Sequence, residues 1–92
     1  MITFNIAGFL TDFTGGQSQI PLDGLPVTVG AGLSRLWELH VGLRDRVVNE
    51  KGEVRLHVNI FVNTENIRDQ QALGTRLSEG DEITILPSVS GG

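Results

Sequence analysis

The chain ends on two glycines, Gly91 and Gly92, which follow the short spacer Ser88, Val89 and Ser90. A carboxylate is a weak electrophile that reacts only after activation, for example as an acyl adenylate, inside a site that excludes water. Because glycine lacks a Cβ atom, a glycine terminus can enter a channel that is too narrow for other residues. The ending therefore predicts that the Gly92 carboxylate is the reactive group and that Gly91 lets it enter a partner's active site.

The residues expected to present this terminus are Pro87, Ser88, Val89 and Ser90. Proline has no backbone N–H to donate to a sheet, so Pro87 should end the last strand. The extended chain from Pro87 to Gly92 would span about 20 Å, far enough to reach the active site of a neighbouring protein. We therefore expect a folded domain over residues 1–87 and a C-terminal tail over residues 88–92.

The other residues able to do chemistry match no catalytic or metal-binding pattern. His40 and His57 lack the spacing of a zinc site, and each has an adequate structural role, near a helix end and on a solvent-facing strand position. The carboxylates of Glu79, Asp81 and Glu82 crowd one turn, which favours a solvated acidic turn over a catalytic pair. We expect no metal site, and a protein that enzymes act upon rather than an enzyme.

Composition narrows the classes of partner. The net charge is −4, and the six arginines and single lysine do not cluster along the sequence, which disfavours a nucleic-acid partner. No cysteine is present, which excludes disulfides and thiolate chemistry and is compatible with a cytoplasmic location. The start of the chain has no signal-peptide pattern, and no apolar run is long enough to cross a bilayer, so we expect no membrane partner.

The first part of the chain has the period of strands. Residues 2–6 alternate between apolar and polar side chains, which predicts a strand with one buried face. Residues 11–16 are rich in turn formers, and residues 17–22 should return as a second strand. Within this hairpin, Gly15 and Gly16 are explained by a turn that needs positive φ angles.

The pattern then changes to that of a helix. Thr28 is a suitable N-cap and Gly42 a suitable stop. Gly30 and Gly32 weaken the first turn, but they permit a close approach to the sheet. The predicted apolar stripe of this helix consists of Val29, Leu33, Leu36 and Trp37.

The clearest strand covers residues 54–63. Before it, residues 43–53 are polar and charged and indicate a loop. After it, residues 63–66 should form a turn, with a short strand at Ile67 and Arg68. The predicted buried positions of the main strand are Leu56, Val58, Ile60 and Val62, and its outward positions are Arg55, His57, Asn59, Phe61 and Asn63.

The last predicted strand covers residues 82–86, and Leu73 and Leu77 should add core contacts from the irregular segment before it. The order of elements is strand, strand, helix, strand, short strand, strand. Such an order predicts an α+β protein with one helix packed across one mixed sheet.

The closing stretch EGDEITILPSVSGG resembles the ending of the ubiquitin-like sulfur carriers of the MoaD/ThiS type. The stretches HVNIFVNTENIR (residues 57–68) and TGGQ (residues 14–17) are similar to the CysO-like carriers of cysteine biosynthesis. This resemblance implies a β-grasp fold with a mixed sheet of four to five strands. The residues that match the family ending are Gly80, Asp81, Ile83, Ile85, Leu86, Pro87, Gly91 and Gly92.

The resemblance also implies a reaction cycle. A ubiquitin-activating-type enzyme would adenylate the Gly92 carboxylate with ATP and Mg²⁺, and a sulfur donor would convert the adenylate to a thiocarboxylate. The sulfur would then pass to a synthase, such as a cysteine synthase, a thiazole synthase or the large subunit of molybdopterin synthase. Many molybdopterin-branch members carry Pro-Pro where this chain has Pro87 and Ser88, which favours the CysO-like branch. The carrier itself would bind no cofactor.

Two alternatives use the same residues differently. The chain is a protein modifier if Gly92 is joined to lysines of other proteins, and it is an interaction domain if the tail is idle. Phe61 and Leu86 are the side chains we expect to contact a partner. Phe61 alternates onto the polar face of its strand, where it is a docking residue, a single exposed aromatic or a residue covered by the tail.

Overall fold

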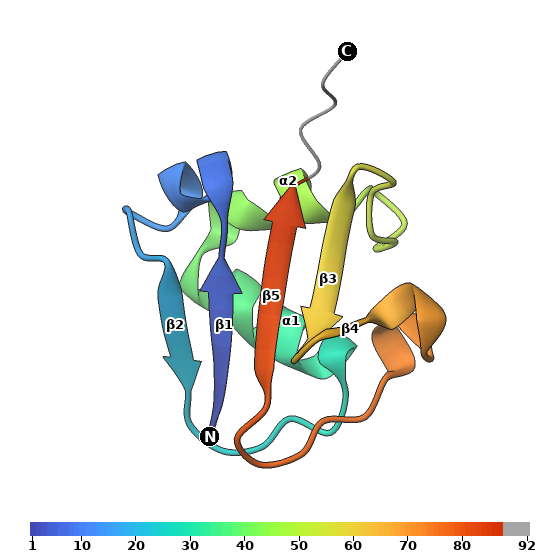
Figure 1. Ribbon diagram of the computed structural model, residues 1–92. Coiled ribbons are helices and arrows are strands. Elements are labelled where there is room, and N and C mark those ends of the chain that lie inside the picture. The colour runs from blue at the N-terminus through green and yellow to red at the C-terminus, as the bar shows by residue number, and fades with distance from the viewer. Residues whose placement is uncertain (88–92) are drawn as a thin grey trace.

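The computed structural model describes residues 1–87, and the strands of this part form one mixed sheet (Figure 1). The order across the sheet is β2-β1-β5-β3-β4. β1 and β5 run parallel, and the other neighbouring pairs are antiparallel. β5, the last strand in the sequence, therefore lies at the centre. The strands are β1 (Ile2–Ile6), β2 (Gln19–Leu22), β3 (Val58–Val62), β4 (Glu65–Asn66) and β5 (Glu82–Pro87).

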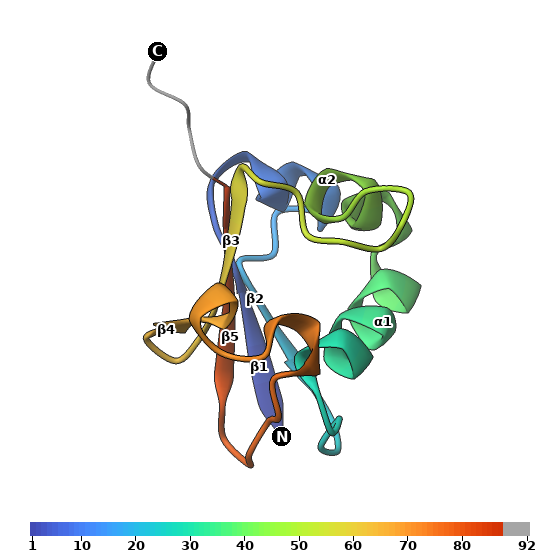
Figure 2. The same cartoon turned by 90° about the vertical axis from the view of Figure 1, so that its right-hand side faces the viewer.

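The helices α1 (Val29–Leu39) and α2 (Arg44–Val47) lie on the same side of the sheet (Figure 2). The core lies between this helical layer and the inward faces of the strands, and Phe4, Ile83 and Ile85 are fully buried in it. The opposite face of the sheet is not covered by either helix. Short 3₁₀ helices connect these elements at Gly8–Phe13, Val41–Leu43, Ile67–Asp69 and Ala72–Gly74.

The predicted helix is confirmed as α1. The Thr28 side chain accepts a hydrogen bond from the Ala31 backbone N–H at 3.2 Å, as expected of an N-cap. A Cβ atom at Gly32 would lie 3.4 Å from the Phe4 ring, so glycine does allow the close approach to the sheet. The helix ends earlier than predicted, with His40 rather than Gly42 at its C-cap, because the backbone leaves the helical region at His40 (φ −137°, ψ 78°).

The prediction of a loop over residues 43–53 was wrong in part. Leu43, Val47 and Val48 are buried, and α2 occupies four residues of the segment. The error arose because three apolar residues, separated by charged ones, form a single amphipathic turn that is too short to show a helical period. The remainder is a turn closed by a bridge between Val48 and Val54.

The prediction that Leu56 is buried was also wrong. β3 begins only at Val58, and the Leu56 side chain is 93% exposed. A turn interrupts the alternation, because the Arg55 N–H donates to the Val47 carbonyl and the Val58 N–H donates to the Arg55 carbonyl. Val58 and Ile60 are buried as predicted, whereas Val62 is only half-buried.

Other boundaries moved by a few residues. The predicted short strand at Ile67 and Arg68 lies two residues earlier, as β4, and residues 67–69 form a 3₁₀ helix capped by the Asn66 side chain. In the hairpin, part of the expected turn is the 3₁₀ helix Gly8–Phe13, and β2 begins at residue 19. Gly15 and Gly16 have φ angles of 66° and 87°, which confirms the prediction of positive φ.

Candidate functional site: the root of the tail

β5 carries the chain through the centre of the sheet to Pro87, the last residue that the structure describes. Its inward residues Ile83 and Ile85 are fully buried, and its pairing with both β1 and β3 fixes its position. Pro87 is itself part of the strand, opposite Val58 and buried, so the strand ends one residue later than predicted. Proline is tolerated there because the ladder ends at that position.

The neighbour of Pro87 on the β1 side is the start of the first 3₁₀ helix. Gly8 has a φ of +61°, and a Cβ atom there would lie 3.3 Å from Pro87 Cγ. Another residue at position 8 would therefore meet both backbone strain and a tight contact with the proline ring. The Ala7 N–H donates to the Ile85 carbonyl at 3.1 Å, which ties the same segment to β5. Pro87 is thus held from both sides, and we call its surroundings the root of the tail.

The predicted site residues fall into two groups. Pro87, Leu86 and Phe61 are placed in the sheet. The other predicted residues, Ser88, Val89, Ser90, Gly91 and Gly92, lie outside the described residues, and their roles stay predictions.

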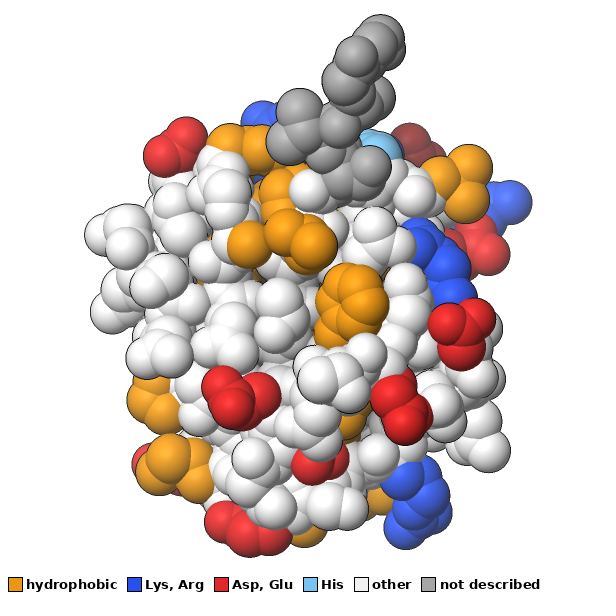
Figure 3. Space-filling model, viewed as in Figure 1, with side chains coloured by type: hydrophobic (Ala, Val, Ile, Leu, Met, Phe, Trp, Pro, Cys, Tyr) orange, Lys and Arg blue, Asp and Glu red, His pale blue; other side chains and the backbone are white. Residues whose placement is uncertain are grey.

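Phe61 and Leu86 lie on the sheet face that the helices leave uncovered. Asn59 pairs with Leu86 and Phe61 pairs with Thr84, so Phe61 and Leu86 are diagonal neighbours on adjacent strands. The Leu86 side chain is 42% exposed, and Phe61 is half-buried. Figure 3 shows this face, where apolar side chains gather around the upper end of β5.

Two further exposed apolar side chains lie close in sequence to residues that touch Pro87. Phe9, next to Gly8, is 51% exposed, and Leu56 lies two residues before Val58. The sequence did not predict that either side chain is exposed. Phe9 gave no periodic signal because it lies in a 3₁₀ helix, and Leu56 was in phase with the buried positions of the next strand.

The acidic turn before β5 has a structural role. Glu79 pairs with the Met1 ammonium group. The Asp81 carboxylate accepts hydrogen bonds from the Ser78 N–H at 2.8 Å and from the Asn63 amide at 3.0 Å. Glu82 accepts from the Asn5 amide at 3.0 Å. These bonds stabilise the turn and its junction with β5, whereas the sequence indicated only a solvated acidic turn.

The histidines lie apart, with His40 at the end of α1 and His57 exposed in the turn before β3. In residues 1–87, no group of three or more His, Asp or Glu side chains is arranged to hold a metal ion. No helix in this part of the chain has the length and apolar character needed to cross a membrane.

Comparison with known proteins places this architecture. The model of the ThiS family matches residues 5–92. The sulfur carrier protein CysO of Mycobacterium tuberculosis is 38% identical over 93 residues, which cover 99% of this chain and 98% of CysO. Small archaeal modifier protein 1 of Haloferax volcanii is 36% identical over 84 residues, covering 90% of this chain and 91% of the modifier. Among solved structures, a chain of the BexX/CysO complex of Amycolatopsis orientalis matches with a TM-score of 0.89 at 32% identity, and the match covers 100% of each chain.

A mixed sheet with a central last strand and a helix packed across it is the β-grasp fold of ubiquitin-like proteins. The chain belongs to the ThiS family, within the group that contains the CysO sulfur carriers and the small archaeal modifiers. Its relatives are carriers and modifiers rather than catalysts. The resemblance found in the closing sequence is thereby confirmed.

Proposed function

We propose that this protein is a sulfur carrier whose Gly92 carboxylate is adenylated and then converted to a thiocarboxylate. The observation that carries the proposal is the match to the ThiS family, which extends through residue 92, together with the identity to CysO along nearly the whole chain. In this function, residues 1–87 form the folded domain and residues 88–92 the tail that carries the reactive group.

The first step uses ATP and Mg²⁺ on a ubiquitin-activating-type enzyme. A Gly92 carboxylate oxygen attacks the α-phosphorus of ATP, and pyrophosphate leaves. Sulfide from a donor then attacks the acyl carbon, and AMP leaves with the oxygen that it shares with the acyl group. The carrier supplies the substrate carboxylate, a root fixed between β1 and β3, and the apolar contacts Phe61 and Leu86 for docking.

The second step delivers the sulfur to a synthase. Identity to CysO favours an enzyme of cysteine biosynthesis as the acceptor, ahead of the large subunit of molybdopterin synthase. A relative of this chain has been solved in a complex with BexX, which supports transfer within a complex of two proteins.

The intact mass of the protein tests the proposal. The purified chain is incubated with the activating enzyme of the same genome, ATP, Mg²⁺ and a sulfide donor. We expect a mass increase equal to the exchange of one oxygen for sulfur, located at Gly92 by fragmentation. An unchanged mass, in a reaction where a known carrier is converted by its own enzyme, would contradict the proposal.

A second candidate function is protein modification through Gly92. The observation that favours it is the 36% identity to small archaeal modifier protein 1. Denaturing immunoblots of cells that express an epitope-tagged chain separate the two functions. A ladder of larger conjugates that disappears when Gly92 is deleted supports modification, and a single band supports a carrier alone.

A further inference from the structure

A notch beside the root of the tail is lined by side chains from three segments. Phe9 comes from the first 3₁₀ helix, Asp45 and Arg46 from α2, and Arg55 and His57 from the turn before β3. Its volume is about 270 Å³. We call it the tail-root notch.

The notch is close to Pro87 on two sides. Phe9 follows Gly8, where a Cβ atom would lie 3.3 Å from Pro87 Cγ, and His57 precedes Val58, which pairs with Pro87. An enzyme that draws Gly92 into its active site lies within about 20 Å of Pro87, because the extended tail spans no more than that. The notch is therefore within reach of such an enzyme.

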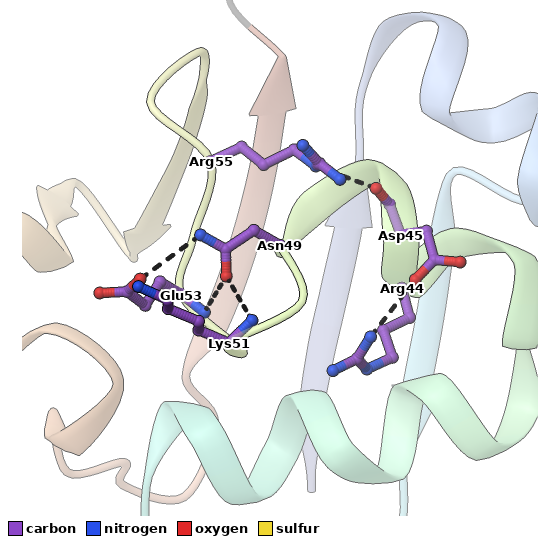
Figure 4. A network of polar contacts seen from close by, with 6 residues as sticks. All are labelled: Arg44, Asp45, Asn49, Lys51, Glu53 and Arg55. Carbon is purple, nitrogen blue, oxygen red and sulfur yellow. Dashed lines mark hydrogen bonds and ion pairs between the residues drawn. The ribbon is translucent and has the colours of Figure 1, made fainter.

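Two arginines hold positive charge in the notch. The Arg46 guanidinium lies 4.7 Å from the centre of the Phe13 ring, and Arg55 Nε donates to the Asp45 backbone carbonyl at 2.9 Å (Figure 4). These contacts fix both guanidinium groups without neutralising them. Of the carboxylates, Asp45 pairs with Arg44 at 3.3 Å, and within residues 1–87 no carboxylate forms an ion pair with Arg46 or Arg55.

The arginines do not cluster along the sequence, but the fold brings two of them together. Arg46 and Arg55 are separated along the chain by a turn, but the hydrogen bond from Arg55 to Asp45 brings them to the same notch. A guanidinium has five N–H donors, and Arg55 uses only one of them, its Nε–H, in the bond to Asp45. The remaining donors match the geometry of an incoming carboxylate.

The half-exposed ring of Phe9 in the same notch indicates which anion fits. A segment that carries Asp or Glu beside an apolar residue satisfies both the arginines and Phe9. A phosphate group would leave Phe9 without a contact, and the net charge of −4 disfavours nucleic acid. We propose that the tail-root notch binds an acidic segment of the enzyme that activates Gly92. This inference rests on the proposed function, because it assigns a partner to the same tail.

The test is steady-state ATP–pyrophosphate exchange by the activating enzyme of the same genome, with the carrier as the varied substrate. The notch variant is Arg46→Glu with Arg55→Glu. A neutral variant, Arg46→Gln with Arg55→Gln, tests the same contact if charge reversal prevents folding. The matched control is Arg35→Glu with Arg76→Glu, which reverses two exposed arginines outside the notch. Circular dichroism melting checks that each variant is folded.

For the notch variant we expect the KM for the carrier to rise by about tenfold with kcat unchanged, and the dependence of kcat/KM on salt to become weaker. The neutral variant should show a smaller rise in the same direction. The control should stay within about twofold of the wild type. Equal KM values for the notch variant and the control would overturn the proposal.

Inorganic phosphate, titrated into ¹⁵N-labelled protein, distinguishes a general anion site. Saturable shifts of the Arg46 and Arg55 Nε–H signals below about 1 mM phosphate would overturn the proposal. No saturation is expected. Absence of exchange with the wild-type chain would overturn the proposed function and this inference together, whereas exchange with an unchanged KM in the notch variant overturns this inference alone.

Discussion

The strand β5 begins and ends in different surroundings. At its start, Asp81 is bonded to Ser78 and Asn63, and Glu82 is bonded to Asn5. At its end, the charged groups of Arg46 and Arg55 have no carboxylate partner in residues 1–87. The polar groups at the start of the strand bond to one another within the fold. The guanidinium groups near its end keep N–H donors that a partner can use.

This difference separates stability from recognition in one strand. Polar groups that bond to each other stabilise the folded chain and have little left to offer a partner. Fixed charges and half-exposed apolar side chains contribute little to the fold, but they are suited to an interface. The two ends of β5 should therefore respond differently to mutation.

The largest expected effect comes from deleting Gly92. We expect complete loss of thiocarboxylate formation, because the reacting carboxylate would belong to Gly91 and lie one residue short of its position in the partner. The melting temperature should not change, because residues 88–92 follow the last strand. Intact-mass spectrometry and circular dichroism measure the two results. Retained conversion in the shortened chain would refute the assignment of Gly92.

An intermediate effect is expected for Leu86→Ala, on the uncovered face beside Phe61. The KM for the carrier in ATP–pyrophosphate exchange should rise by about fivefold to tenfold, since a central apolar contact contributes more than about 1 kcal/mol to an interface. Val27→Ala is the matched control, because Val27 is 57% exposed and lies in the loop before α1. If both variants behave alike, the uncovered face is not the docking surface.

The smallest effect is expected at the start of β5, from Asp81→Ala. Loss of the bonds to Ser78 and Asn63 should cost about 1–2 kcal/mol of unfolding free energy. At about 4–8 °C per kcal/mol, thermal melting resolves this change in a domain of this size. The exposed Glu50→Ala is the control, and the KM for activation should be unchanged in both. A raised KM in Asp81→Ala alone would extend the docking surface to this end of the strand.

The sequence was sufficient to predict the elements that have a regular pattern of apolar residues. Alternation located β1 and the second half of the predicted strand that contains β3, and the stripe of Val29, Leu33 and Leu36 located α1, because each covers enough residues to establish a period. β5 was located by the turn before it and the proline at its end. The short elements were missed or misplaced for the opposite reason. α2 has four residues and β4 has two, so local turns rather than periodicity determine them.

Only those residues of the candidate site that are adjacent in sequence could be predicted. Pro87, Leu86 and the terminal glycines are recognisable because they are adjacent in sequence. The tail-root notch could not be predicted, because Phe9, Arg46 and His57 come from three separate segments. They meet only in the folded chain, where α2 and the turn before β3 lie beside the first 3₁₀ helix.

The central position of β5 also sets when the protein can fold during its synthesis. β1 is made first, but its parallel neighbour is made last, and β3 needs the same neighbour on its inner edge. A nascent chain interrupted before residue 82 would leave the edges of β1 and β3 that face β5 unpaired, and such a chain would be exposed to degradation. The sheet can therefore close only once β5 has been translated as far as Pro87, so a folded chain is one that already carries the attachment point of the tail.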